Sequence, residues 1–131
     1  MKVFHYISFV VIIIVLAGLC IIEESVVSAS LKEVQDACFE IESSLEGYQT
    51  LKNMDLVLQV DNLEYMWAED ESALCYMVNH KNLQEIGQEI AKLKMYVKDD
   101  DVFAFKVSLQ QIKFYCKGYL HFMGASIHNV L

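Results

Sequence analysis

Residues 83–101 read LQEIGQEIAKLKMYVKDDD, and this stretch decides the fold class. Its larger apolar residues recur at spacings of three and four: Leu83, Ile86, Ile90, Leu93 and Val97. Residues at this spacing share one face of an α-helix, so the stretch predicts an amphipathic helix with one buried stripe. Asn82, with Glu85 three residues on, is the expected N-terminal cap of that helix. The aspartates at positions 99–101 end that helix and suit the positive N-terminal end of the next one.

Three further stripes of the same kind flank this one. They are Leu31, Val34, Cys38, Ile41 and Leu45; Leu56, Val60, Leu63, Trp67, Leu74 and Val78; and Phe105, Leu109, Ile112, Cys116 and Leu120. Short polar breaks separate them, and the chain has no proline and only five glycines. The pattern predicts an all-α protein, in which an N-terminal transmembrane or signal helix is followed by an antiparallel bundle of about four helices.

The N-terminal segment carries no amphipathic stripe. Residues 4–22 read FHYISFVVIIIVLAGLCII and are almost wholly apolar. As a helix they span about 28 Å, close to the thickness of one hydrocarbon core. Lys2 precedes them and Glu23 and Glu24 follow, so the positive-inside rule places the N-terminus in the cytoplasm and the rest of the chain outside.

We therefore expect two parts, an anchor or signal segment at 1–29 and an extracytoplasmic helical domain at 30–131. Val27-Ser28-Ala29 has small residues suited to signal peptidase, and cleavage after Ala29 would yield a secreted protein. The apolar core is long for a signal peptide, which favours a retained single-pass anchor. Ser30 and Glu33 have the spacing of a capping box, which would start a new helix at Ser30. Alternatively, if the anchor is retained, the first bundle helix continues the membrane helix outward.

Charge and residue types exclude some functions. The net charge is −8 and every basic residue is lysine, which argues against nucleic acid as a partner. Metal binding at Cys38, Cys75 or Cys116 is disfavoured because no Cys-x-x-Cys motif occurs. Buried free thiols and one internal disulfide both remain open for these cysteines. The aspartates at 99–101 lack the alternating ligands of a calcium loop.

The four histidines are scattered along the sequence, and their spacing indicates no catalytic pair of nucleophile and general base. The residues predict no catalytic, metal or cofactor site, and the chain is expected not to be an enzyme.

A family resemblance emerges from a tryptophan at 67, the Asn79-His80 loop, the helix quoted above and the closing SIHNVL at 126–131. The chain resembles small bacterial (Firmicute) proteins grouped as the domain-of-unknown-function family numbered 4363. The matching positions are Trp67, His80, Leu93, Tyr96 and Asn129 to Leu131. The loop departs from the family pattern, with polar or basic residues where acidic or small ones are expected. The resemblance implies no activity, because the family has none assigned.

These observations favour a membrane-anchored interaction or scaffold protein of the cell envelope. It would contact the membrane through residues 4–22 and bind another envelope protein. One alternative is a module that binds a small apolar ligand or lipid in a cavity lined by Trp67, Phe105 and Phe114. Another is a secreted effector, if the leader is cleaved.

Overall fold

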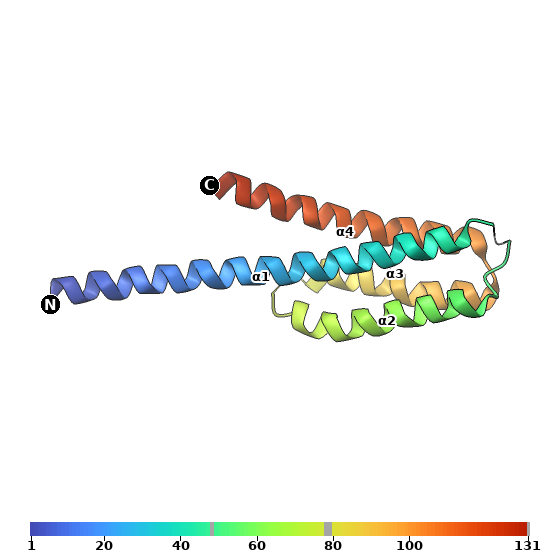
Figure 1. Cartoon of the computed structure of the whole chain (residues 1–131), viewed down its shortest axis with the longest axis horizontal. Helices are drawn as coiled ribbons and strands as arrows, with labels where there is room; N and C mark the ends of the chain where they lie inside the picture. The colour runs from blue at the N-terminus through green and yellow to red at the C-terminus, as the bar shows by residue number, and fades with distance from the viewer. Residues whose placement is uncertain (48, 78–79, 131) are drawn as a thin grey trace.

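Four helices make up the part of the chain that the structure describes (Figure 1). The computed structural model describes the backbone of residues 1–47, 49–77 and 80–130, and their side chains apart from residues 80 and 125–130. The helices are α1 (Lys2–Leu45), α2 (Met54–Leu74), α3 (His80–Asp99) and α4 (Val102–Val130). The predicted all-α class is confirmed, with no strand among the described residues.

Helix α1 contains both the apolar segment at residues 4–22 and the first helix of the bundle. Its 44 residues reach about 66 Å. It runs through residues 29 and 30 without a break, so Ser30 caps no helix; the first bundle helix instead continues the leader outward. Helix α1 is long and apolar enough to cross a membrane. An 18-residue window within it has a mean hydropathy of 2.7, and no part of that window is buried inside the molecule. Because α1 is one helix, no loop separates the apolar segment from the bundle.

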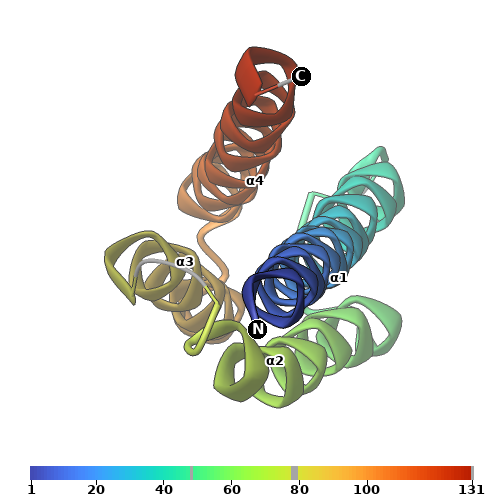
Figure 2. The ribbon, with the colours of Figure 1, turned by 90° about the vertical axis from the view of Figure 1, so that its left-hand side faces the viewer.

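The helices follow an up-and-down course. Helix α1 packs against α2 and α4, and α3 packs against the same two helices. Figure 2 looks along α1 and shows the four arranged around a common centre. The last turns of α4 lean away from α1, and the C-terminal end of α4 lies on the same side of the bundle as the apolar half of α1 (Figure 1).

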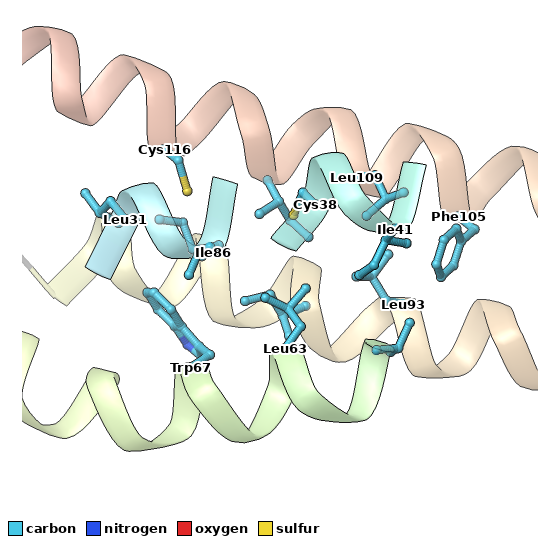
Figure 3. Packing of buried hydrophobic residues seen from close by; sticks show 14 of the residues in the cluster. Leu31, Cys38, Ile41, Leu63, Trp67, Ile86, Leu93, Phe105, Leu109 and Cys116 are labelled. Carbon is cyan, nitrogen blue, oxygen red and sulfur yellow. The ribbon is translucent and has the colours of Figure 1, made fainter. Parts of the chain in front are cut away.

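The predicted stripes form the core. All of their described members are buried, except Val97 and Leu120, which are partly buried and pack against the core. Val78, the last residue of the second stripe, lies outside the described residues. Leucine, isoleucine, one phenylalanine and one tryptophan fill the space between the helices (Figure 3). Burying these side chains is the main driving force for the fold.

Polar side chains define the turns. The Asn53 side chain accepts a hydrogen bond from the Asp55 amide at 2.9 Å, and the Asp101 carboxylate accepts one from the Ala104 amide at 3.0 Å. Both are N-terminal caps. Asn82 was the predicted cap of α3, but α3 begins two residues earlier, at His80. No helix-breaking residue stands between His80 and Asn82, so the helix extends through them.

Candidate functional site

A groove lined with aromatic side chains runs between α3 and α4. We call it the aromatic groove, and its volume is about 470 Å³. It is lined by Asn82, Glu85, Ile86, Phe114, Tyr115, Gly118, Tyr119 and Phe122. Phe114 is 69% exposed and Phe122 is 72% exposed. Large apolar side chains this exposed along one groove mark a surface suited to binding.

The inner wall of the aromatic groove is ordered by contacts within α4. The Phe114 and Tyr115 rings meet edge to face, with centroids 6.2 Å apart. The Gln111 amide donates a hydrogen bond to the Tyr115 hydroxyl oxygen at 3.0 Å. These contacts hold Tyr115 against the core and leave the Phe114 ring outward. Glu85 is the one lining residue with a carboxylate, so the groove suits apolar groups flanked by positive charge.

A second hollow, of about 210 Å³, adjoins the groove where the apolar segment meets the bundle. It is lined by Cys20, Glu23, Glu24, Val27, Met77, Tyr119, Phe122 and Met123. Tyr119 and Phe122 line both hollows. Burial, together with the negative charge of Glu23, raises the pKa of Tyr119, so its hydroxyl stays protonated at neutral pH.

Trp67 marks the contact between α2 and α3. A Cβ atom built on Gly87 would lie 2.9 Å from Nε1 of Trp67, so the indole packs directly on the α3 backbone. The indole N–H is buried and finds no acceptor among the described residues. A groove of about 380 Å³ runs beside it between the two helices. Trp67 itself is only 3% exposed, which makes it a packing residue.

A charged cluster ties α1 to α4. Lys113 forms an ion pair with Glu42, and its ammonium group sits 4.5 Å from the centre of the Phe39 ring. The Gln110 amide donates a hydrogen bond to the other Glu42 oxygen at 2.6 Å. The Lys113 side chain is only 11% exposed, so the Glu42 carboxylate and the Phe39 ring stabilise its positive charge in place of water.

The cysteines are free thiols in this structure. Cys38 and Cys116 are buried in the core from α1 and α4 (Figure 3), and burial raises the pKa of each to about 12. Thiols with such values stay protonated at neutral pH and are poor nucleophiles. Cys75 is partly buried at the end of α2 and packs against the core.

The histidines are spread over the molecule. The His5 ring hydrogen-bonds the Met1 carbonyl at 2.9 Å, and His121 is exposed on α4. The side chains of His80 and His128 lie outside the described residues. Among the residues that are described, no three His, Cys, Asp or Glu side chains are grouped so as to hold a metal ion.

The positions that carry the family resemblance and whose side chains the structure describes do not form one cluster. Trp67 and Leu93 are buried at separate levels of the core (Figure 3), and Tyr96 is partly buried near the end of α3. His80 begins α3 and Asn129 lies in the last turn of α4, with side chains outside the described set; Leu131 lies outside it altogether. The motif residues whose side chains the structure describes therefore serve to pack the helices against one another.

The predicted ligand cavity is not assembled by the residues proposed for it. Trp67 and Phe105 are each buried in the core, whereas Phe114 points out into the aromatic groove. Periodicity placed Trp67 and Phe105 on the buried stripes of their helices and left Phe114 off the stripe of its own. Phe114 lies two residues after Ile112 of the buried stripe, a rotation of about 200° around the helix, which turns it to the outside of α4.

Three structural contacts were not predicted from the sequence. They are the close approach of Gly87 to Trp67, the Glu42–Lys113 pair, and the hydrogen bonds that Asp100 makes to the loop before α2. The signals were a glycine within a strong helical pattern and a lysine next to a buried stripe. Neither identifies its partner, because the partners lie on other helices.

Comparison with known proteins gives one match. Residues 22–130 match the model of a family described as a domain of unknown function (DUF4363). No curated protein and no solved structure matches the chain. The match begins at the last residue of the apolar segment and covers the rest of α1 together with the other three helices.

Proposed function

Because the chain belongs to the family described as a domain of unknown function (DUF4363), with its activity unassigned, we propose a role from the surface it presents. The protein is a non-enzymatic, membrane-anchored interaction protein of the cell envelope. The apolar half of α1 anchors it, and the aromatic groove binds another envelope protein. The observation that carries the proposal is the continuous α1, which joins an exposed apolar span to a solid helical core.

The continuous helix also favours a retained anchor. Val27 is only 1% exposed and belongs to the core, although it precedes the predicted cleavage site after Ala29. Cleavage there would remove a core residue and open one end of the bundle. With the anchor retained, Lys2 directly before the span favours a cytoplasmic N-terminus and an external bundle.

The chemistry of the aromatic groove indicates the kind of partner. Exposed Phe114 offers apolar contact, and Glu85 with the net charge of −8 favours a partner that carries lysine or arginine. The same charge disfavours nucleic acid. A partner segment with apolar side chains flanked by basic ones satisfies both features.

Photo-crosslinking in cells tests the groove. Benzoylphenylalanine replaces Phe114 in one variant and Phe103 in the other. Phe103 is 80% exposed near the start of α4 and does not line the groove, so it is the matched control. We expect a protein adduct at Phe114 alone, and Phe114→Asp should abolish co-purification of the same partner. Equal adducts at both positions, or none at Phe114, would contradict the proposal.

N-terminal sequencing of the protein from membrane and medium tests the anchor. A membrane-bound chain that keeps its leader supports it, whereas a released chain beginning at Ser30 would support the secreted alternative. A C-terminal alkaline phosphatase fusion should be active if the bundle lies outside. The volume of the aromatic groove also falls in the range of small-ligand sites. A small apolar molecule found by native mass spectrometry would favour the ligand-binding alternative.

A further inference from the structure

The aromatic groove reaches the level at which the apolar segment ends. Cys20 lies inside the apolar segment, yet it lines the same hollow as Tyr119, Phe122 and Met123 of α4. These α4 residues therefore stand beside the last turn of the span. Figure 1 shows α4 continuing past this point toward the N-terminal side of the molecule.

The connection after α2 reaches the same place. Met77 lines the hollow with Cys20, and its neighbour Tyr76 is 92% exposed. Phe122 on α4 is 72% exposed. Tyrosine concentrates where a bilayer meets water, because the ring enters the acyl boundary while the hydroxyl stays hydrated. Tyr76 and Tyr119 supply such rings at this end of the bundle, and Met77 and Phe122 add apolar side chains to it.

Resting on the proposed anchoring by α1, we propose that the anchor-side end of the bundle lies on the bilayer surface, with Tyr76, Met77 and Phe122 among the lipid headgroups. Its occupant is lipid of the membrane that α1 spans. If α1 crosses the bilayer through residues 4–22, Cys20 is within the hydrocarbon and the α4 residues beside it reach the interface. The aromatic groove then opens directly at the membrane surface.

This placement has two consequences. The bundle is held at a defined angle by two contacts, α1 within the bilayer and the end of α4 upon it. The partner of the aromatic groove must also approach along the membrane, because the Phe122 end of the groove is closed by lipid. Helix α4 can lie in this zone because an α-helix satisfies its own backbone hydrogen bonds.

Three exposed phenylalanines provide a matched set of probes. Phe9 lies in the apolar segment, Phe122 at the anchor-side end and Phe103 at the far end of α4, with exposed fractions of 63%, 72% and 80%. Phe103 and Phe122 are 19 residues apart on one helix, about 28 Å. Substitution at any of the three leaves the core intact, and circular dichroism checks the fold of each variant.

Each position receives benzoylphenylalanine in the full chain, which is reconstituted into phosphatidylcholine vesicles, irradiated and weighed by mass spectrometry. We expect phospholipid adducts at Phe9 and Phe122 and none at Phe103. An adduct at Phe9 alone would overturn the inference and leave the anchor intact. Adducts at all three would place the bundle on its side and also overturn it. Failure at Phe9 would overturn the anchor and the inference together.

A second copy of the chain is the competing occupant. Cross-linking of Phe122 to another copy, in place of lipid, would overturn the inference and leave the anchor standing. Dilution of the protein in the vesicles separates the two, because a lipid adduct is independent of protein density and a dimer adduct is not.

Discussion

At Gly87 the backbone of α3 approaches Trp67 so closely that no side chain fits between them. The nearest atom to an added Cβ would be Nε1 of the indole, at 2.9 Å. The indole is large, rigid and buried, so it cannot turn aside cheaply. Elsewhere in a helix, glycine costs about 1 kcal/mol relative to alanine. At this position close packing outweighs that cost.

Gly87→Ala should therefore destabilise the protein by about 1 kcal/mol, because overpacking of about 1–3 kcal/mol exceeds the gain in helix propensity. Urea unfolding measures the change. Gly118→Ala on α4 is the matched control, since nothing lies within 4 Å of an added Cβ there. The control should be neutral or stabilising; equal stabilisation by both substitutions would show that Trp67 does not need the glycine.

Asp100 links the two turns at the end of the bundle opposite the anchor. Its carboxylate accepts hydrogen bonds from the Leu51 amide at 2.6 Å and from the Thr50 hydroxyl at 2.9 Å. Its φ of 54° lies in the left-handed region, which aspartate and asparagine tolerate better than most residues. The hydrogen bonds from Leu51 and Thr50 hold the pKa of Asp100 below its usual 3.8.

A group with a lowered folded-state pKa contributes stability above its unfolded pKa and loses it as pH falls through the folded value. Asp100→Asn should thus lower the urea midpoint at neutral pH and flatten its decline below pH 3.8. Asp99→Asn, at an exposed neighbouring position, should change neither. An unchanged acid limb in Asp100→Asn would show that the carboxylate contributes nothing to folding.

At the scale of the elements, α1 and α4 are joined by apolar packing and by one charged cluster. Lys113 is the more buried partner, with 11% of its side chain exposed against 37% for Glu42. Removing the carboxylate leaves a nearly buried ammonium that has lost its ion-pair partner and lies over the Phe39 ring. Removing the ammonium leaves a carboxylate that water still reaches. Loss of Glu42 and loss of Lys113 should therefore lower the free energy of unfolding by different amounts.

We expect Glu42→Gln to cost about 2 kcal/mol and Lys113→Met less than about 1 kcal/mol, because only the first strands a charge. Thermal unfolding of the single and double variants, as a double-mutant cycle, measures both costs and the coupling. Lys94→Met is the control, since its pairs with Asp61 and Glu64 are at the surface and contribute little. A larger cost for Lys113→Met than for Glu42→Gln would refute the asymmetry.

For the whole molecule, the bundle and the apolar segment share one helix, so the position of any cut decides how much core survives. A chain beginning at residue 23 keeps Val27 and the contact of Glu23 with Tyr119, whereas one beginning at residue 30 loses both. Losing a buried valine costs about 1.5–3 kcal/mol. Fraying of the shortened α1 adds to that cost.

The chain from residue 30 should therefore unfold at lower urea concentration than the chain from residue 23. Both should keep the same helical signature by circular dichroism. Equal midpoints would mean that residues 23–29 are a linker and would support residue 29 as the domain boundary. The comparison uses soluble proteins, so it is independent of any membrane.

Much of this architecture follows from the chain alone. Spacings of three and four predicted the four helices and nearly all of the buried side chains, because which residues face inward is a local property of helix geometry. The length and hydropathy of residues 4–22 predicted a segment able to cross a membrane, and the structure has a helix there that is long and apolar enough. The predicted cap at Asn82 was wrong because helix ends depend on small local energies, which neighbouring packing overrides.

What the amino-acid sequence determined by itself is thus the helical class, the inward faces and the apolar segment at one end. The tertiary structure alone decided that leader and bundle are one continuous helix, that Gly87 receives Trp67, and that Glu42 meets Lys113. It alone gathered Tyr119 and Phe122 beside Cys20. The physical reason is the distance along the chain between the residues that interact. Periodicity indicates only which residues share a face within a turn or two of one helix. The aromatic groove and its place beside the anchor depend on how separate helices pack.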